Sequence, residues 1–263
     1  MITAGVDIGS TASKALLMSE GRMLSSIIGP SSTNPARTAR DIYDQALAAA
    51  GVTAAEVRFV VGTGYGRAQV PFAHTNVSEI SCHGRGAHFA LPSARTVIDI
   101  GGQDTKAISI DRSGNLLDFA MNDKCAAGTG RFFEVMARAL EIDLDDLGPR
   151  ALEAKKSLGL SSVCTVFAES EVVGMVARGE TVEDIAAALC AVSAEKVVAL
   201  AHRVGVESPV TVTGGVPKNI GFLRALEKQL GLKVNVPEEP QIMGALGAAL
   251  ISIEELCASR KVG

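Results

Sequence analysis

Residues 6–16 read Val-Asp-Ile-Gly-Ser-Thr-Ala-Ser-Lys-Ala-Leu, and residues 98–108 read Ile-Asp-Ile-Gly-Gly-Gln-Asp-Thr-Lys-Ala-Ile. Aspartate, isoleucine, glycine, lysine and alanine occupy equivalent positions in the two copies. Each copy continues as an apolar strand, a turn and a second strand, which is the pattern of a β-hairpin. A repeat of roughly 90 residues exceeds the units of solenoids, which span about 20 to 50 residues. The sequence therefore predicts a duplicated domain, with two lobes that begin with the same hairpin.

Helical patterns with clear end signals follow the hairpins. The segment 36–50 has helical periodicity and stops at Gly51. Thr181 and Asp184 have the spacing of a capping box, which opens an amphipathic helix that reaches Val204. Strands that alternate with helices in this way indicate mixed α/β lobes.

Composition and charge exclude several classes of protein. With 263 residues and 47% hydrophobic content, the chain can build a core in each lobe. Its net charge of −4 is spread along the sequence and gives no basic stripe, so nucleic acid is not an expected partner. The longest apolar run, residues 242–253, is shorter than the about 20 residues that cross a bilayer. No signal-peptide pattern precedes Asp7, so we expect a cytoplasmic protein without a membrane partner.

Three strand ends have the composition of phosphate-binding turns. Asp7 and Asp99 each end an apolar strand and are followed by glycine and small residues, which let backbone N–H groups approach an anion. Residues 213–216, Thr-Gly-Gly-Val, repeat this design between a strand and a helix. One such turn alone is more often an ordinary tight turn. Three of one kind predict a nucleotide cradle, and the pattern matches neither Walker A nor the dinucleotide fingerprint.

The paired hairpins and the late Thr-Gly-Gly segment resemble the phosphate-1, phosphate-2 and adenosine segments of the superfamily of actin, Hsp70 chaperones and sugar kinases. The resemblance implies an α/β fold of two duplicated, actin-like (ribonuclease-H-like) lobes, with ATP or ADP and Mg²⁺ in a nucleotide cleft between them. We expect lobe I at residues 1–85, completed by a C-terminal helix at 240–263, and lobe II at residues 86–239.

The same resemblance implies roles for the residues of the turns. Asp7 and Asp99 would hold Mg²⁺ through water, since this ion keeps much of its hydration and prefers carboxylate oxygens. Asp104 or Gln103 would orient the attacking water. Lys14 would clamp a phosphate, with a solvated hairpin lysine as the alternative. The expected nucleotide-contacting set is Gly9, Ser10, Thr11, Ala12, Ser13, Lys14, Asp99, Gly101, Gly102, Gly214, Gly215 and Gln241.

The five cysteines favour reduced thiols over a disulfide framework. Cys125 and Cys164 each precede a helical pattern, where the positive end of the helix dipole favours an anionic metal–thiolate centre. Two cysteines cannot complete a four-thiolate site, and the sequence has no Cys-x-x-Cys pair. A two-fold dimer would double the two ligands to four. The alternative from sequence physics is a pair of small buried side chains.

Four stretches resemble the activator family of 2-hydroxyacyl-CoA dehydratases and benzoyl-CoA reductases; they are residues 62–67, 77–84, 122–132 and 164–171. This resemblance implies that Cys125 and Cys164 of two subunits bind one [4Fe-4S] cluster per homodimer. It also implies an ATP-driven one-electron donor that is reduced by ferredoxin or flavodoxin. The acceptor would be an iron–sulfur dehydratase or reductase, or a double-cubane cluster protein.

Two alternatives remain open for the function. One is a small-molecule kinase of the same superfold, and the other is a nucleotide-dependent interaction module with inert cysteines. Cys82 and Cys190 are expected to be packing residues, because free cysteine is commonly buried. Cys257 lies near the C-terminus, and the histidines have no metal-ligand spacing.

Overall fold

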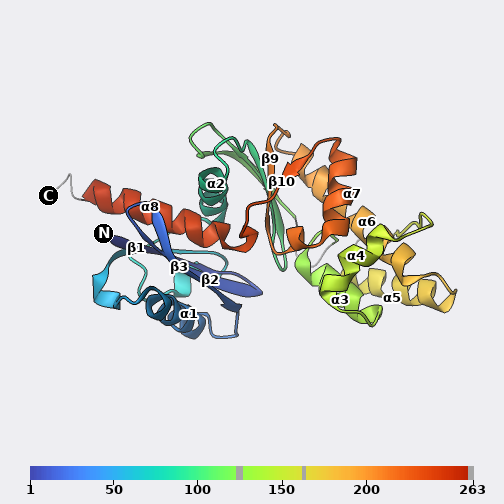
Figure 1. The fold of residues 1–263 in the computed structure, drawn as a ribbon, viewed down its shortest axis with the longest axis horizontal. Coiled ribbons are helices and arrows are strands. Elements are labelled where there is room, and N and C mark those ends of the chain that lie inside the picture. The colour runs from blue at the N-terminus through green and yellow to red at the C-terminus, as the bar shows by residue number, and fades with distance from the viewer. Residues whose placement is uncertain (123–126, 162–163, 260–263) are drawn as a thin grey trace. The chain divides into compact units, whose positions relative to one another are not determined.

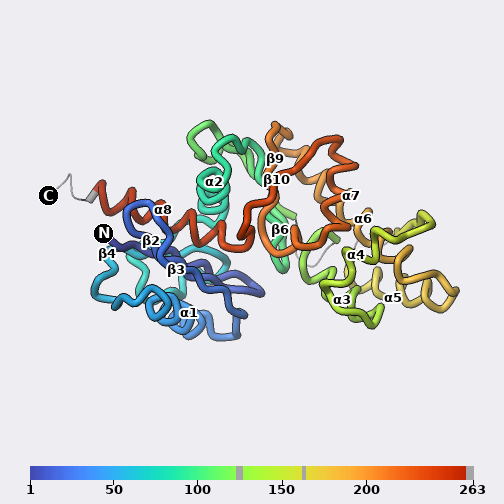
Figure 2. The backbone as a smooth tube through the Cα atoms, viewed as in Figure 1, coloured from blue at the N-terminus to red at the C-terminus, as the bar shows by residue number. Residues whose placement is uncertain are grey.

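The computed structural model describes residues 1–122, 127–161 and 164–259 (Figure 1). The chain divides into two compact units. Unit 1 contains residues 1–94, 110–117 and the segment that starts at 237, and unit 2 contains residues 95–109 and 118–236. Unit 2 is therefore inserted into unit 1 along the chain, and the C-terminal segment returns to the unit in which the chain began. The backbone trace in Figure 2 follows this path from the blue N-terminal hairpin to the red C-terminal helix.

Unit 1 is built on a five-stranded sheet of order β3-β2-β1-β4-β5. Its strands are β1 (Ile2–Ile8), β2 (Ala12–Ser19), β3 (Arg22–Pro30), β4 (Val57–Thr63) and β5 (Thr75–Asn76). The helices are α1 (Pro35–Ala50), α2 (Glu79–Ala90) and α8 (Met243–Ser259), with short 3-10 turns at Ala54–Glu56, Arg67–Gln69 and Pro240–Ile242. Strands β1, β2 and β3 run antiparallel, whereas β4 pairs parallel with β1.

Both faces of the first sheet are covered. On β2, Ala15 and Leu17 pack in the cluster that contains α1, whereas Leu16 and Met18 pack with α8. A strand that is buried on both faces needs apolar residues at consecutive positions, which explains its nearly continuous apolar sequence.

Unit 2 repeats the same strand arrangement in a sheet of order β10-β9-β6-β7-β8. The strands of this sheet are β6 (Thr96–Ile100), β7 (Thr105–Ile110), β8 (Leu116–Met121), β9 (Val210–Gly214) and β10 (Val234–Asn235). The end of β7 and the start of β8 fall within the segment 110–117 of unit 1. Its helices are α3 (Gly130–Ala139), α4 (Leu147–Leu152), α5 (Thr165–Ala177), α6 (Val182–His202) and α7 (Ile220–Leu230), with 3-10 turns at Leu144–Asp146 and Val216–Lys218. The β6–β7 hairpin is antiparallel and β9 joins β6 in parallel, as β4 joins β1. The sequence repeat therefore corresponds to a structural one.

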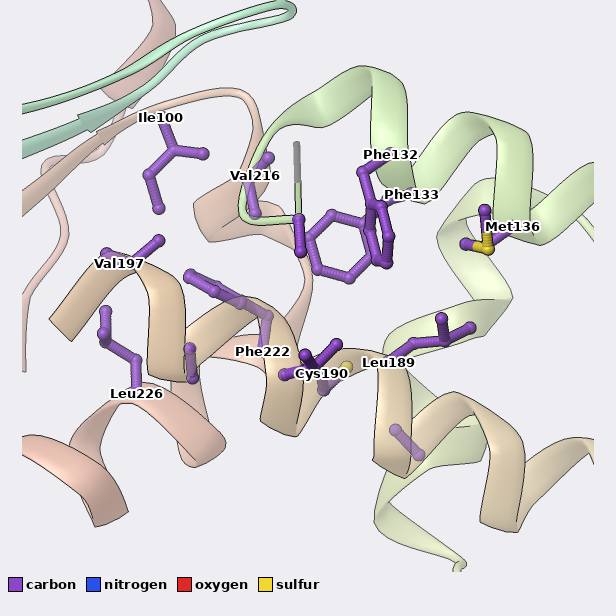
Figure 3. Packing of buried hydrophobic residues seen from close by; sticks show 14 of the residues in the cluster. Ile100, Phe132, Phe133, Met136, Leu189, Cys190, Val197, Val216, Phe222 and Leu226 are labelled. Carbon is purple, nitrogen blue, oxygen red and sulfur yellow. The ribbon is translucent and has the colours of Figure 1, made fainter. Parts of the chain in front are cut away.

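The core of unit 2 packs residues of α3, α6 and α7 together with residues of β6, β9, α4 and α5; Figure 3 shows part of it. Phe133 of α3 meets Phe132 and Phe222 edge to face, with ring centroids 5.7 and 5.8 Å apart. Such edge-to-face pairs add to the stabilisation from burial alone.

Cys190 lies in the core cluster of unit 2 and Cys82 lies in the core of unit 1, both buried as expected. Burial raises the pKa of each thiol to about 12, which keeps both protonated.

The helix ends follow the predicted signals, except that the Asp184 side chain does not complete the predicted capping box. The helix α1 ends at Gly51 in the left-handed conformation, and Thr181 caps α6 by accepting a hydrogen bond from the Asp184 N–H at 3.2 Å. The Asp184 carboxylate accepts bonds from the backbone N–H groups of Lys155 (2.7 Å) and Lys156 (2.8 Å). These hydrogen bonds hold the pKa of Asp184 below its ordinary value, and the bond from Lys156 has the largest effect. Asp184 therefore fixes the preceding loop to the helix start.

Two helical stretches, 182–202 and 240–258, are long and apolar enough to cross a bilayer by length and composition. In their most apolar windows 67% and 50% of the residues are buried within the protein. Core helices of globular proteins pass the same test, so these stretches are weak evidence for a membrane span.

Helix α8 approaches its neighbours in unit 1 very closely. Glycines make this approach possible: a Cβ on Gly86 of α2 would overlap the Met243 carbonyl, and one on Gly247 of α8 would overlap the Cys82 carbonyl. On the sheet side, a Cβ on Gly5 of β1 would overlap the Ala245 carbonyl. The first strand and the last helix are therefore packed backbone to backbone.

We expect Gly247→Ala to lower the free energy of unfolding by about 3 kcal/mol, because the added methyl would have to displace backbone atoms rather than a flexible side chain. Urea titration of the purified variant measures this change. Gly159→Ala is the matched control, since a Cβ there meets no atom within 4 Å. Equal stability of the two variants would contradict the close approach of α8 and α2.

Candidate functional site

The first predicted turn joins β1 to β2 and contains a partly buried ion pair. Strand pairing places Asp7 opposite Lys14, and the Lys14 Nζ lies 3.3 Å from the Asp7 Oδ2. Asp7 is only 3% exposed. A Cβ on Gly9 would lie 2.5 Å from the Ala12 carbonyl oxygen, so the turn requires glycine at this position. The hairpin therefore holds a carboxylate and an ammonium group together at the base of a tight, glycine-dependent turn.

The remaining residues of this turn are held by a neighbouring loop. The Ser13 hydroxyl lies 2.8 Å from that of Ser31, and the Ser31 hydroxyl donates to the Gly9 carbonyl at 2.7 Å. The Ser31 N–H donates to the Thr11 carbonyl at 2.9 Å. Ser13 thus supports the turn from within, whereas Thr11 is exposed.

The second turn joins β6 to β7 and has the same design with one more acid. Asp99 lies opposite Lys106, and the Lys106 Nζ lies 3.5 Å from the Asp99 Oδ2 and 2.6 Å from the Asp104 Oδ1. The Thr213 hydroxyl donates to the other oxygen of Asp99 at 2.9 Å. Lys106 and Asp99 are 3% and 2% exposed, whereas Asp104 is partly exposed. Gln103 and Gly102 lie in the turn itself.

Lys106 and Thr213 were not assigned from the sequence. The signal for Lys106 was present, because the repeat aligns it with Lys14. Thr213 belongs to the late Thr-Gly-Gly segment, and its bond to Asp99 follows from the parallel pairing of β6 and β9.

The strand β9 brings the predicted adenosine segment to the second turn. Gly214 pairs with Ile100 and has a φ of 91°, and a Cβ there would overlap the Ile100 carbonyl. The Gly215 N–H donates to the same carbonyl at 3.2 Å. Within unit 2 the structure therefore gathers Asp99, the 101–104 turn and the two glycines at one end of the sheet. The 9–14 turn and Gln241 belong to unit 1.

The two predicted cysteine ligands differ in what the structure describes. Cys164 is the N-cap residue of α5 and is exposed. The Ser161 N–H donates to the Glu171 carboxylate at 3.0 Å, which anchors the chain just before Cys164. Cys125 lies outside the described residues. Among the described residues, no group of three or more His, Cys, Asp or Glu side chains is arranged to hold a metal ion.

The segments that flank residues 123–126 are hydrogen-bonded to the second turn. The Thr105 N–H donates to the Asn122 side-chain oxygen at 2.7 Å, and the Asn122 N–H donates to the Thr105 carbonyl at 3.1 Å. The Thr105 hydroxyl donates to the Gly128 carbonyl at 2.5 Å. The N–H groups of Gly130 and Arg131, in the first turn of α3, donate to the carbonyls of Gly101 (2.9 Å) and Gly102 (2.7 Å). The second phosphate turn and the start of α3 are thus one hydrogen-bonded assembly.

A family model described as the BadF/BadG/BcrA/BcrD ATPase family matches residues 4–252. This chain belongs to that ATPase family. Among its relatives, the 2-hydroxyisocaproyl-CoA dehydratase activator of Clostridioides difficile is 43% identical over 99% of this chain and 98% of its own length. The (R)-2-hydroxyglutaryl-CoA dehydratase activating ATPase of Acidaminococcus fermentans is 41% identical, covering 96% of this chain and 97% of its own.

Solved structures of family members and of more distant proteins share the fold. The activator of the 2-hydroxyisocaproyl-CoA dehydratase from Clostridium difficile with bound ADPNP gives a TM-score of 0.93 at 42% identity, over 100% of this chain and 98% of that one. A ROK family glucokinase from Streptomyces griseus gives 0.61 at 17% identity, over 97% and 100% of the two chains, and shows the fold alone. The predicted α/β, two-lobe actin-like ATPase fold and the predicted family are confirmed.

Proposed function

We propose that this protein is the ATP-hydrolysing activator of a partner iron–sulfur enzyme and supplies it with single electrons at low potential. One observation carries the proposal: the second turn, which has the composition of a phosphate-binding turn, is hydrogen-bonded to the segments on both sides of Cys125. The relatives named as dehydratase activators, which match this chain over nearly its whole length, support the same role. The partner class is a 2-hydroxyacyl-CoA dehydratase or a related acyl-CoA reductase.

In this proposal both glycine turns contact the phosphates of Mg²⁺-bound ATP. The buried carboxylates of Asp7 and Asp99 suit this ion, since Mg²⁺ is bound through one or two carboxylates together with water and phosphate oxygens. Lys14 and Lys106 pair with these carboxylates and offer positive charge next to the phosphates. Asp104, or Gln103 beside it, orients the attacking water. Gly214 and Gly215 leave room for the adenosine, because neither presents a side chain.

Cys125 and Cys164 of two subunits would together provide the four thiolates of one [4Fe-4S] cluster. Of the two cysteines the structure describes Cys164, and its position suits a cluster ligand because its thiol is exposed at the start of a helix. When bound, the cluster would supply one-electron chemistry at a potential set by its exposure and hydrogen bonds. We propose ferredoxin or flavodoxin as the electron donor and the cytoplasm as the location.

A surface next to Cys164 fits a second copy of the chain. On α5, Val166 and Phe167 are 67% and 68% exposed, and Val173 and Val176 are 54% and 47% exposed. Exposed apolar side chains gathered on one helix favour a protein–protein contact. Two-fold pairing through this face would bring the two Cys164 side chains towards one axis, as a shared cluster requires.

The test is an anaerobic assay with the reconstituted protein and its iron–sulfur partner. We expect bound iron and sulfide in equal amounts, and electron delivery to the partner that requires ATP and stops with a non-hydrolysable analogue. ADP release that needs a small-molecule acceptor, but neither iron nor the partner, would instead identify a kinase. A dimer that hydrolyses ATP without binding iron would support a nucleotide-dependent interaction module and overturn the electron-transfer role.

A further inference from the structure

Two glycines from distant parts of unit 1 enclose the carboxylate of Asp7. Gly64, just after β4, has a φ of 86°, and a Cβ there would overlap the Asp7 Oδ1 and lie 2.6 Å from the Ile8 carbonyl oxygen. Gly244, in the first turn of α8, would place a Cβ 2.8 Å from the Asp7 Oδ2 and 2.9 Å from the His83 Nε2. Each carboxylate oxygen thus faces the bare backbone of one glycine.

The turn that carries Gly64 is fixed to the end of β1. The Gly66 N–H donates to the Ile8 carbonyl at 2.8 Å. The Gly64 carbonyl accepts two bonds from Arg67, at 3.2 Å from its N–H and at 3.1 Å from its guanidinium. Residues 62–67 are one of the stretches singled out in the sequence, and these bonds give it a structural purpose: the turn is held rigidly beside Asp7.

Gly244 differs in kind from the other glycines around α8. Gly86 and Gly247 would meet backbone carbonyls, so they are required for helix packing. Gly244 would meet side-chain atoms instead, chiefly those of Asp7. Within a helix glycine is less favourable than alanine by about 1 kcal/mol. Glycine at position 244 is therefore explained by the space that the Asp7 carboxylate occupies, and not by a requirement of the helix.

We propose that Gly64 and Gly244 are positioning residues that confine the Asp7 carboxylate to one orientation, and that this orientation sets the affinity for the Mg²⁺ that accompanies the nucleotide. This inference rests on the proposed nucleotide site. Its physical basis is that the Lys14 ammonium contacts the Asp7 carboxylate at one of its two oxygens, Oδ2, so the two glycine walls must fix the rotation of the group. A carboxylate held in one orientation presents the same oxygen to the hydrated ion at every encounter.

The first test measures binding of a fluorescent ADP analogue as a function of Mg²⁺ concentration. The quantity compared is the Mg²⁺ concentration at which the increase in affinity for the analogue is half complete. Gly244→Ala and Arg67→Ala are expected to fold, because the affected atoms are side-chain ends and a partly exposed guanidinium. We expect Gly244→Ala to raise this concentration about tenfold or more, as changes behind a metal ligand commonly do. Arg67→Ala should raise it severalfold. Affinity for the analogue in EDTA should change much less.

Gly64→Ala should have the largest effect on the Mg²⁺ requirement, although its positive φ adds backbone strain. Gly51→Ala is the matched control for that strain, since Gly51 has a φ of 66° and a Cβ there meets nothing within 4 Å. If Gly64→Ala does not fold, Gly244→Ala and Arg67→Ala decide the question.

A double-mutant cycle separates positioning from general packing. In an Asp7→Ala background the added methyl of Gly244→Ala no longer meets the carboxylate and is left with only the His83 Nε2 as a close neighbour. It should then leave the Mg²⁺ requirement unchanged, and its effect on thermal stability should be smaller than in the wild-type background. An equal loss of stability in both backgrounds, or an unchanged Mg²⁺ requirement in the single variants, would overturn the inference. If the wild-type protein binds the nucleotide without any Mg²⁺ effect, the proposed nucleotide site itself fails.

Discussion

Asp7→Ala is expected to lower the rate of ATP hydrolysis by about a hundredfold or more at saturating Mg²⁺ and ATP. Asp7 is 3% exposed, its carboxylate is flanked by Gly64 and Gly244, and it pairs with Lys14. Phosphoryl transfer depends on charges placed in advance around the phosphates, and removal of one such group typically costs about 10² to 10³ in rate. Release of inorganic phosphate measures the effect.

Two variants make the Asp7 result specific. Asp7→Asn keeps the shape of the side chain, and its rate of ATP hydrolysis should fall by a similar factor. Such a result attributes the effect to the lost charge rather than to packing. Asp41→Ala removes an exposed carboxylate on α1 and should hydrolyse ATP at the wild-type rate. If Asp7→Asn retained full turnover, the first turn would not be the site of the magnesium–phosphate contact.

Cys164→Ala is expected to remove the cluster completely while ATP hydrolysis continues. Since the proposed site takes two thiolates from each subunit, loss of one ligand per subunit leaves two thiolates, which cannot hold a four-iron cluster. Iron and sulfide content and the visible absorption of the anaerobically reconstituted protein give the readout. Cys125→Ala should behave in the same way.

The chain provides a matched control for the cysteine experiment. Cys257 is the other exposed cysteine among the described residues, so Cys257→Ala tests whether any accessible thiol affects reconstitution. We expect this variant to bind iron and sulfide at the wild-type level. A Cys164→Ala protein that kept the full cluster spectrum would eliminate Cys164 as a ligand and, with it, the proposed symmetric site.

The fold was largely predictable because its decisive signal is local and repeated. A strand, a tight glycine turn and a second strand occur twice, and both hairpins form with the aspartate opposite the lysine. The cap of α6 by Thr181 was also predictable, since a cap is made by residues close in sequence.

What could not be predicted depends on contacts between distant residues. Lys106 is a buried centre of charge, whereas a turn lysine is usually solvated. The bond from Thr213 to Asp99 requires the β6–β9 pairing, and Gly244 faces Asp7 only because α8 packs on β1. The Asp184 carboxylate binds the loop before its helix rather than completing a capping box. The proposed roles of the turn residues and of Cys125 stay predictions.

The insertion of unit 2 into unit 1 also has a consequence for biosynthesis. The strands of the first hairpin leave the ribosome early, but α8, which covers Leu16 and Met18, is made only after residue 242. At about 5 to 20 residues per second the wait lasts roughly 10 to 50 s. Unit 2 is made during this time and is complete in sequence only at its end, while one face of the first sheet stays uncovered throughout. Nascent chains that stall before α8 is made should therefore be the species that chaperones bind.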